Sequence, residues 1–463
     1  MNIVTYRFYT CFFSKVIFSM NKIGIILIFI YFNCLSTVSS AGEKAKDNVK
    51  TLTPNANKSL QVSNYDKQLW HENIHQYLQD PLWISRDIYD ASHHLMVPLH
   101  AAFLLKERAW QQDFDSHFRR FLKAYPEGME SGVKQRLNRM HYFYLVSRYL
   151  ALTFDDSGAD DFKKQLYEVC INEIKKVWNE DPAWQWGRSP FSMGVRDRVL
   201  WKLQTKDVPK SYYRAIIDEE LFLFAIAADL LVSSSLVGDA PSKTLLDIMS
   251  IAHRVFESEI VETKNGGWLF QPGVWYDGPG HAYAGQPTKL KGMKVRPLLD
   301  VAWDSSHSHR FPLWITSLEN AYVSGSEENL FFKNLRKGLT IQIINEVLIP
   351  PSETFPVWRV ANYMDGRNGV YRWREKDKFG YGPYELSGTF LIGWWSFLNS
   401  KEISTVYNEI ASSFPLPSFV IKKFVGPNAS RERNSLLILP NQYKNGFIEL
   451  NVRLAAKLYF SES

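Results

Sequence analysis

The residues best suited to chemistry lie between Asn265 and Arg310, where histidines and tyrosines stand among Gly, Pro and Trp. Gly and Pro interrupt this stretch too often for a single helix or strand, so we expect a loop. Its aromatic content argues against disorder, and long loops within a compact chain are commonly functional. The stretch is therefore expected to form the floor of an active site.

Proton transfer and anion binding are the two kinds of chemistry that these side chains could perform. Tyr283 and His281 are candidates for acid–base catalysis, although packed rings or loop-fixing hydrogen bonds would use the same residue types. His307 and Arg310 come just before Pro312, where a helix is expected to begin. The positive end of a helix dipole favours an anion, so these two residues are suited to neutralise a carboxylate, with solvated loop charges as the alternative.

The spacing of His307 and His309 would also suit two ligands of a zinc ion. Protein zinc sites use three or four side chains, and no acidic residue or histidine stands at a typical offset for the third. We therefore expect no metal and no other cofactor.

The segment NGGWLFQPGVWYDGPGHAYAG resembles a motif of the toroidal polysaccharide lyases, which act on chondroitin, hyaluronate, heparin or alginate. Gly266, Gly267 and Trp268 match the opening of the motif. Tyr283 and Gly285 loosely match its tyrosine-glycine ending. The resemblance implies a toroid of helical hairpins and an enzyme that degrades polysaccharides.

The chain departs from that motif at two positions. Asn265 stands where aspartate is usual, and Pro272 stands near the place of the family's histidine, which leaves His281 as the histidine of the segment. The resemblance further implies β-elimination on an anionic, uronic-acid-containing polysaccharide without an obligatory metal. In that reaction a cation or amide stabilises the enolate-like state while a tyrosine or histidine moves the C5 proton. A nucleic-acid partner is not expected.

Aromatic and arginine side chains in the neighbouring loops could bind sugar rings and acidic groups. Core packing and structural ion pairs are the competing explanations for these residue types. A non-catalytic glycan-binding protein would retain them but would not need the groups for proton transfer. The candidates for substrate binding are Trp184, Trp186, Arg188, Trp268, Trp275, Trp303 and Arg359.

A glycoside hydrolase on the same fold is the alternative enzyme class, because the loops also supply carboxyl groups. Such an enzyme needs two carboxyl groups that flank the scissile bond. Asp304 could instead cap a turn, and Glu385 could stabilise the first turn of a helix. The available carboxylates are Asp277, Asp304, Glu353, Asp365 and Glu385.

The rest of the chain has the periodicity of helices. Apolar residues recur at helical spacing, and alternating strand-like patterns are almost absent before residue 430. Tyr212–Val232 is apolar on nearly every side after its first turns, which predicts a buried inner helix. Prolines precede several apolar segments and follow polar loops, as expected at helix starts; they are Pro98, Pro190, Pro312 and Pro383. This plan predicts a mainly α fold, an (α/α) toroid of helical hairpins over residues 64–414.

The two ends of the chain differ from this helical body. Residues 1–41 have the charged start, apolar run and small-residue ending of a signal peptide, with Met20 as an alternative start. Residues 42–63 are polar and predict a flexible tether. Residues 415–463 are expected to form a small β-rich segment with an Asn-Gly turn at Asn445. The protein is thus expected to be periplasmic or secreted, with no stable membrane anchor once the leader is cleaved.

Charge and cysteine content limit the partners further. The 463 residues carry a formal charge of +6, and three of the basic residues lie in the leader, so the remainder is only modestly basic. No global field therefore calls for a polyanion, although one can bind locally. Cys170 is the sole cysteine outside the leader and stands on the apolar face of an expected helix, where it is a buried hydrophobe and not a nucleophile.

Overall fold

The structure, a computed structural model, describes residues 61–127, 129, 135–153, 160–234, 241–373, 380–427 and 433–460. The expected signal peptide and nearly all of the expected tether lie outside these residues. The described chain is mainly helical, as predicted, with two small β-hairpins. None of its helices combines the length and the apolar character needed to cross a membrane.

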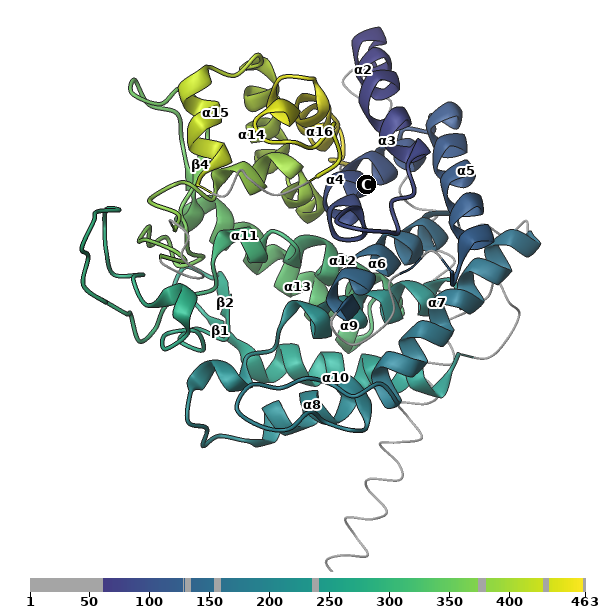
Figure 1. Cartoon of the computed structure of the whole chain (residues 1–463), viewed down its shortest axis with the longest axis horizontal. Helices are drawn as coiled ribbons and strands as arrows, with labels where there is room; N and C mark the ends of the chain where they lie inside the picture. Colours follow the sequence, from purple (N-terminus) through teal and green to yellow (C-terminus); the bar gives the residue numbers. More distant parts are fainter. Residues whose placement is uncertain are drawn as a thin grey trace, which may run out of the picture.

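Four helices with few exposed residues form the centre of the molecule (Figure 1). They are α4 (Asp87–Leu104), α6 (Arg136–Thr153), α9 (Asp218–Val232) and α12 (Phe311–Ala321). Helix α4 packs on α6, α6 on α9, and α9 on α12. Residues 219–232 of α9 are all buried, which confirms the predicted inner helix, although it starts at Asp218 and not at Tyr212.

Amphipathic helices surround this central row. They are α5 (Arg108–Ala124), α7 (Asp161–Asn179), α8 (Gly194–Gln204), α10 (Lys243–Glu259) and α13 (Glu327–Gln342). In α5, Trp110, Phe114, Phe118 and Phe121 recur at helical spacing on one buried face. Because α5 packs on α4, α7 on α6, α10 on α9 and α13 on α12, each inner helix has an outer partner.

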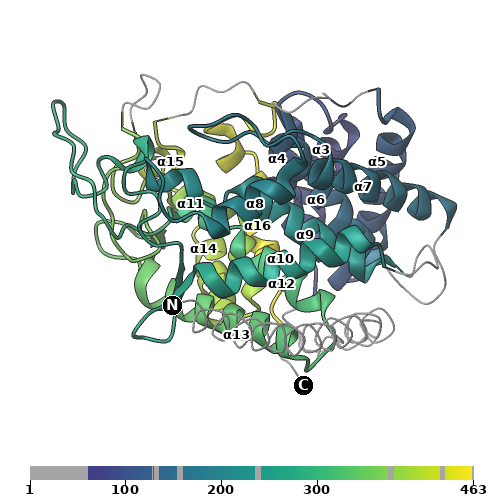
Figure 2. The same ribbon diagram turned by 90° about the horizontal axis from the view of Figure 1, so that it is seen from below.

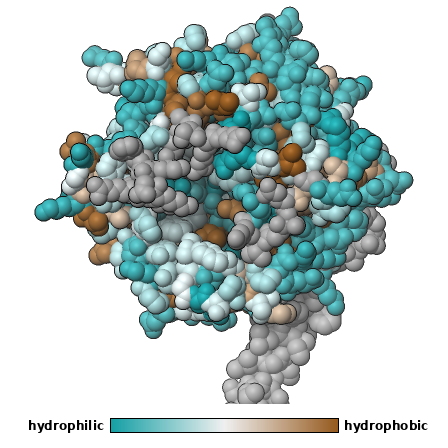
Figure 3. Space-filling model, in the orientation of Figure 1, coloured by the Kyte–Doolittle hydropathy of each residue, from teal (hydrophilic) through white to brown (hydrophobic). Residues whose placement is uncertain are grey.

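Other helices lie on opposite sides of this centre along the long axis of the molecule. Figures 1 and 2 show α5 and α7 on one side, and α11 (Ser305–Ser308), α14 (Lys401–Ser412) and α15 (Ser418–Val425) on the other. Short N-terminal elements, α2 (Asn64–Leu69), η2 (Trp70–His75) and α3 (Gln76–Gln79), precede α4. On the face shown in Figure 3, hydrophilic residues predominate and hydrophobic ones form small separate groups.

Two 3₁₀ helices continue the series after α12 and return it to α4. They are η9 (Ser387–Ile392) and η10 (Trp394–Leu398), and η10 packs on α12. Trp394 donates its indole N–H to the His93 carbonyl of α4 at 2.9 Å. Gly393, which separates the two 3₁₀ helices, has φ 97°, and a Cβ atom there would lie only 2.9 Å from Val97 of α4. Only glycine suits this close approach.

The predicted β-rich segment at residues 415–463 is wrong, because its described residues form α15, η11 (Asn441–Tyr443) and α16 (Phe447–Ala455) and contain no strand. Asn445 does not turn a hairpin. Its side chain accepts the Phe447 N–H at 3.0 Å, and Gly446, at φ 91°, starts α16. Phe447, Leu450 and Leu454 have helical spacing and pack into the main core. The β-branched and aromatic residues around them obscured that spacing in the sequence.

The proline signal was correct at one site and wrong at another. Pro312 lies in the first turn of α12, as predicted. Pro98 lies inside α4, so the residues before it, which were expected to form a polar loop, belong to the helix. A proline within a helix removes one hydrogen bond, and the burial of α4 along most of its length offsets that loss.

Short strands and turns connect the helices on the side that carries the candidate site. Strand β1 (Ile260–Glu262) pairs antiparallel with β2 (Trp268–Phe270), and β3 (Leu348–Ile349), which follows η7 (Ile343–Val347), pairs with β4 (Arg359–Val360). Short 3₁₀ helices η4 (Ser211–Arg214) and η6 (Pro279–His281) interrupt the loops. An isolated bridge between Asp304 and Tyr363 joins the loop before α11 to the loop after β4.

Candidate active site

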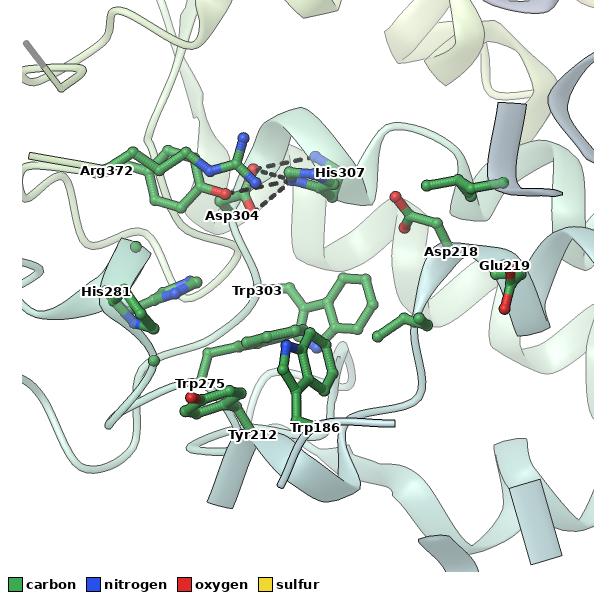
Figure 4. Close-up of a pocket in the computed structure, with 16 residues that line it drawn as sticks. Trp186, Tyr212, Asp218, Glu219, Trp275, His281, Trp303, Asp304, His307 and Arg372 are labelled. Carbon is green, nitrogen blue, oxygen red and sulfur yellow. Dashed lines mark hydrogen bonds and ion pairs between the residues drawn. The ribbon is translucent and has the colours of Figure 1, made fainter. Parts of the chain in front are cut away.

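The expected active-site loop contributes to a cavity of about 330 Å³ (Figure 4). Its walls come from the loop before α8, from η4, from the start of α9, from η6, from α11 and from the segment after β4. The lining residues are Leu137, Trp186, Tyr212, Ile217, Asp218, Glu219, Trp275, Gly278, Pro279, Gly280, His281, Trp303, Asp304, His307, Tyr371 and Arg372.

Asp304 and His307 form a pair joined by several hydrogen bonds on the wall of this cavity. Asp304 caps α11 by accepting the His307 N–H at 3.1 Å, and both of its carboxylate oxygens lie within 2.9 Å of His307 Nδ1. Burial alone would raise the pKa of the Asp304 carboxyl, but His307, Arg372 and Ser306 together lower it. The ionised carboxylate holds Nδ1 in its protonated form, so Nε2 is the imidazole nitrogen with a lone pair to accept a proton.

Tyr371 completes this cluster. Its hydroxyl lies 3.5 Å from His307 Nδ1, and the centroids of the two rings are 6.5 Å apart. Burial raises the pKa of Tyr371 well above its usual value, and the charge of Asp304 adds to the shift. The phenol therefore stays protonated and can donate. Arg372 follows Tyr371 and lines the same cavity.

His281 lies on the other side of the cavity, where its ring is nearly parallel to that of Trp275. Burial lowers the pKa of His281 to about 4, so the imidazole is neutral at pH 7. Within the described residues neither His281 Nε2 nor the indole nitrogen of Trp303 has a hydrogen-bond partner, although both are buried. Such groups usually have partners, so both are suited to bind a polar ligand.

Aromatic rings form the floor of the cavity. Trp186 and Trp275 meet edge to face with ring centroids 6.0 Å apart, and Tyr212 stacks beside Trp275 at 6.3 Å. Faces of this kind suit the apolar sides of sugar rings. Trp184 packs against Trp186 at 4.9 Å but does not line the cavity, and it is 47% exposed.

Buried ion pairs fix the start of α9 beside this floor. Glu219 contacts Arg136 at 2.8 Å and Arg198 at 2.6 Å, while Glu220 contacts Arg198 and Lys202, each at 2.7 Å. Burial would raise the pKa of Glu219, but Arg198 and Arg136 lower it to about 2. Removing one member would leave a buried charge unpaired, so the network holds the first turn of α9 in place.

Arg310 does not line the first cavity. Its guanidinium is buried and donates to Asp218, to His93 Nε2 at 3.1 Å and to the Tyr89 hydroxyl at 2.9 Å. It lines a second cavity of about 210 Å³, which shares His307, Tyr371 and Arg372 with the first.

The structure thus brings together only part of the predicted site. His281, His307, Asp304, Trp186, Trp275 and Trp303 line the first cavity, and Arg310 and Glu385 line the second. The predicted residues outside both linings are Tyr283, Trp184, Arg188, Trp268, Arg359, Asp277, Glu353 and Asp365.

Tyr283, the first candidate for proton transfer, is half-buried on the Gly-rich loop. Trp268 is a core residue whose indole donates to the Leu335 carbonyl at 2.7 Å. The guanidinium of Arg188 lies over the Phe191 ring, and that of Arg359 lies over the Tyr384 ring.

The predicted carboxylates also have local roles. Asp277 accepts the Ser211 hydroxyl at 2.7 Å, and Asp365 accepts the Ala302 N–H at 2.9 Å. Glu385 pairs with Lys289 at 2.7 Å, whereas Glu353 is exposed. Of the five, only Asp304 lines the first cavity, where its carboxylate neighbours are Asp218 and Glu219.

Four cavity-lining residues have no distinguishing signal in the sequence: Tyr371, Arg372, Tyr212 and Asp218. Tyr371 follows the Asn-Gly pair of NYMDGRNGVYRW, and this pair together with the preceding Asp-Gly pair predicts a tight turn or short hairpin beside the cleft. Asp218 lies in the acidic first turn of α9, where carboxylates stabilise a helix whether or not they have another role. Neither signal distinguishes a cavity-lining residue from a structural one.

The described residues contain no group of three or more His, Cys, Asp or Glu side chains that could hold a metal ion. His307 Nδ1 faces Asp304, and His309 Nδ1 faces the Ser306 carbonyl at 2.6 Å. Comparison with family models, with curated proteins and with solved structures finds no match for this chain.

Proposed function

We propose that this protein is an exported polysaccharide-degrading enzyme, a lyase that cleaves uronic-acid-containing glycans by β-elimination. The observation that carries the proposal is the cluster of Asp304, His307 and Tyr371 in the first cavity, of which His307 and Tyr371 also line the second. It combines an oriented imidazole and a protonated phenol with an aromatic floor for sugar rings.

The two proton transfers of β-elimination can be assigned to this cluster. His307 Nε2 removes the weakly acidic C5 proton of the uronate, and Asp304 stabilises the imidazolium that forms. Tyr371 donates its hydroxyl proton to the departing O4 and is reprotonated afterwards. The electron pair from the broken C5–H bond forms the C4–C5 double bond, and the C4–O4 bond breaks. The arginines of the shared wall and the second cavity stabilise the negative charge that develops at the uronate carboxylate.

The packing of the helices supports the toroid expected from the resemblance. The inner row α4, α6, α9 and α12 has an outer partner at each step, and η10 returns to α4. We propose that this series is an (α/α) toroid, and that residues 1–41 direct export to the periplasm or the exterior.

A glycoside hydrolase is the second candidate, because Asp218, Glu219 and Asp304 line the same cavity. A hydrolase needs one carboxyl group that is protonated at working pH. The pKa values of Glu219 and Asp304 are both lowered, and Asp218 accepts a hydrogen bond from Arg310. These observations favour the lyase. A non-catalytic glycan-binding protein would use the aromatic floor alone.

One experiment separates the three functions. The mature protein is incubated with a panel of acidic and neutral polysaccharides, and both ultraviolet absorbance and reducing ends are followed. A lyase produces absorbance from the C4–C5 double bond together with new reducing ends. New reducing ends without absorbance identify a hydrolase, and binding without either product identifies a binding protein.

A further inference from the structure

The second cavity differs in character from the aromatic one. Four arginines line it, Arg86, Arg310, Arg372 and Arg433, against two carboxylates, Asp90 and Glu385. Much of its wall comes from α4 and from the segment that begins at Arg433.

Arg310 has its own partner in Asp218, so the unbalanced charge on this wall is that of Arg86 and Arg433. Asp90 is buried and is shared by Arg86 at 3.1 Å and Arg433 at 3.7 Å. Glu385 pairs with Lys289, which lies outside the lining. The single negative charge of Asp90 thus balances only one of the two guanidinium charges, and an anion bound in the cavity would balance the other.

His309 adds a second, independent requirement on the ligand. It is 2% exposed, and its Nδ1 lies 2.6 Å from the Ser306 carbonyl, so Nδ1 carries the proton and donates. Its Nε2 is then an acceptor, and it has no partner within the described residues. A buried acceptor requires a donor, such as a hydroxyl group. Burial and the charge of Arg310 lower the pKa of His309, which keeps the ring neutral.

We propose that the second cavity is a subsite for one acidic sugar unit, in which the arginines bind a carboxylate or a sulfate ester and His309 accepts a hydrogen bond from a hydroxyl group. The inference rests on the proposed function in taking the ligand to be a sugar. The glycan then spans both cavities, with its neutral faces on the aromatic floor and its acidic unit among the arginines. The shared wall of His307 and Tyr371 lies at the bond between them.

Equilibrium binding tests this subsite without any bond being cleaved. Glucuronate, glucose 6-sulfate and glucose are titrated calorimetrically into the wild type, Arg433→Gln and Arg119→Gln. Arg433→Gln leaves Asp90 paired with Arg86, whereas Arg119 is an exposed arginine that pairs with Asp160. We expect both acidic sugars to bind at least about tenfold more tightly than glucose, and Arg433→Gln to remove about tenfold of their affinity, the usual scale for a charged hydrogen bond. Whichever acidic sugar binds more tightly identifies the anion.

Equal affinity for glucose and the acidic sugars overturns the proposal, and so does unchanged affinity in Arg433→Gln. If that variant does not fold, Arg86→Gln replaces it. His309→Phe should weaken glucuronate binding and spare inorganic sulfate, and an equal loss for both ligands would overturn the hydroxyl assignment. Arginine-dependent binding without cleavage of any polysaccharide would sink the proposed lyase and keep the subsite. If Arg433→Gln cleaves the polysaccharide at the wild-type kcat/KM, the subsite is overturned and the proposed lyase is kept.

Discussion

The state of one imidazole nitrogen governs the chemistry proposed for the site. His307 Nδ1 contacts both oxygens of Asp304, whose lowered pKa keeps the carboxylate ionised. The same carboxylate caps α11, so the ring and the backbone of His307 are held by one group. Without the negative charge of Asp304, the proton of the His307 ring would no longer be held on Nδ1, although the shape of the cavity would stay the same.

Asp304→Asn tests this arrangement. Asn is also a good N-cap and keeps the cap of α11, but the lowered pKa of Asp304 means that its charge stabilises the fold, so the free energy of unfolding should fall by at least about 1 kcal/mol. Because the amide can no longer fix the Nδ1 proton, kcat should fall by roughly 10²- to 10⁴-fold. Steady-state kinetics on the polysaccharide identified by the panel measures the effect. Glu353→Gln, at an exposed glutamate, is the matched control and should retain full activity.

The sequence and the structure favour different tyrosines for proton transfer, Tyr283 and Tyr371 respectively. Tyr371→Phe removes the hydroxyl near His307, and kcat should fall by about 10²- to 10⁴-fold. Tyr283→Phe changes a side chain outside both cavity linings and should change kcat by less than about threefold, since it removes no group that transfers a proton. The reverse outcome would restore Tyr283 as the proton-transfer residue and reject the cluster.

At this scale the sequence identified residue types better than positions. His281, His307, Trp275 and Trp303 were found because histidines and tryptophans are concentrated in a loop rich in Gly and Pro. Tyr371 was missed because it lies 64 residues after His307 in the chain, and only the tertiary fold brings the two together. Local spacing carries no information on such a contact.

At the scale of elements, the segment after β4 docks on the Gly-rich loop and thereby positions Tyr371. Val370 donates its N–H to the Gln286 carbonyl at 3.1 Å, and Arg372 donates to Gly280 at 2.8 Å. Gly369 makes this approach possible, because a Cβ atom there would lie 1.6 Å from the Ala284 carbonyl oxygen.

Gly369→Ala should therefore separate the two loops. We expect the free energy of unfolding to fall by about 1–3 kcal/mol, the usual cost of overpacking. We also expect a lower kcat, because Tyr371 would be displaced. Urea denaturation and kinetics measure the two effects. Gly382→Ala is the control, since its nearest neighbour would be an ordinary contact at 3.5 Å. Equal effects of the two substitutions would contradict this account of the docking.

The elements themselves were largely predictable where the pattern was helical and uninterrupted, as in α9. Errors arose where a strong local signal competed with burial. Pro98 suggested a helix start, yet it lies inside α4, and Asn445-Gly446 suggested a hairpin, yet it starts α16. In both cases packing against the core decides the structure, and the sequence shows that packing only indirectly.

At the scale of the whole molecule, histidines are unusually often buried. They contact aromatic rings, carbonyl groups or buried arginines throughout the central helices. Burial lowers the pKa values of His93, His94, His100, His117, His141, His281 and His309. Each is therefore held neutral in the folded state at a pH where the unfolded chain would protonate it.

This set of histidines predicts that acid destabilises the fold well above the range in which carboxylates titrate. The folded pKa of His117 is about 4, against an ordinary value of 6.5, mainly because of burial. Its contribution is fully present above pH 6.5 and is lost as the pH falls toward 4, because the unfolded state binds the proton first. Each such histidine lowers the free energy of unfolding by up to about 1.4 kcal/mol per pH unit in that window. Urea unfolding of the wild type at several pH values between 7.5 and 5 should show a steep decline.

His117 contacts the Leu78 carbonyl and the Tyr142 hydroxyl, each at 2.9 Å, so His117→Gln should lower stability at pH 7.5. The substitution should also reduce the change in the free energy of unfolding per pH unit, because one histidine fewer takes up a proton on unfolding. An unchanged slope would show that His117 does not titrate as its burial requires.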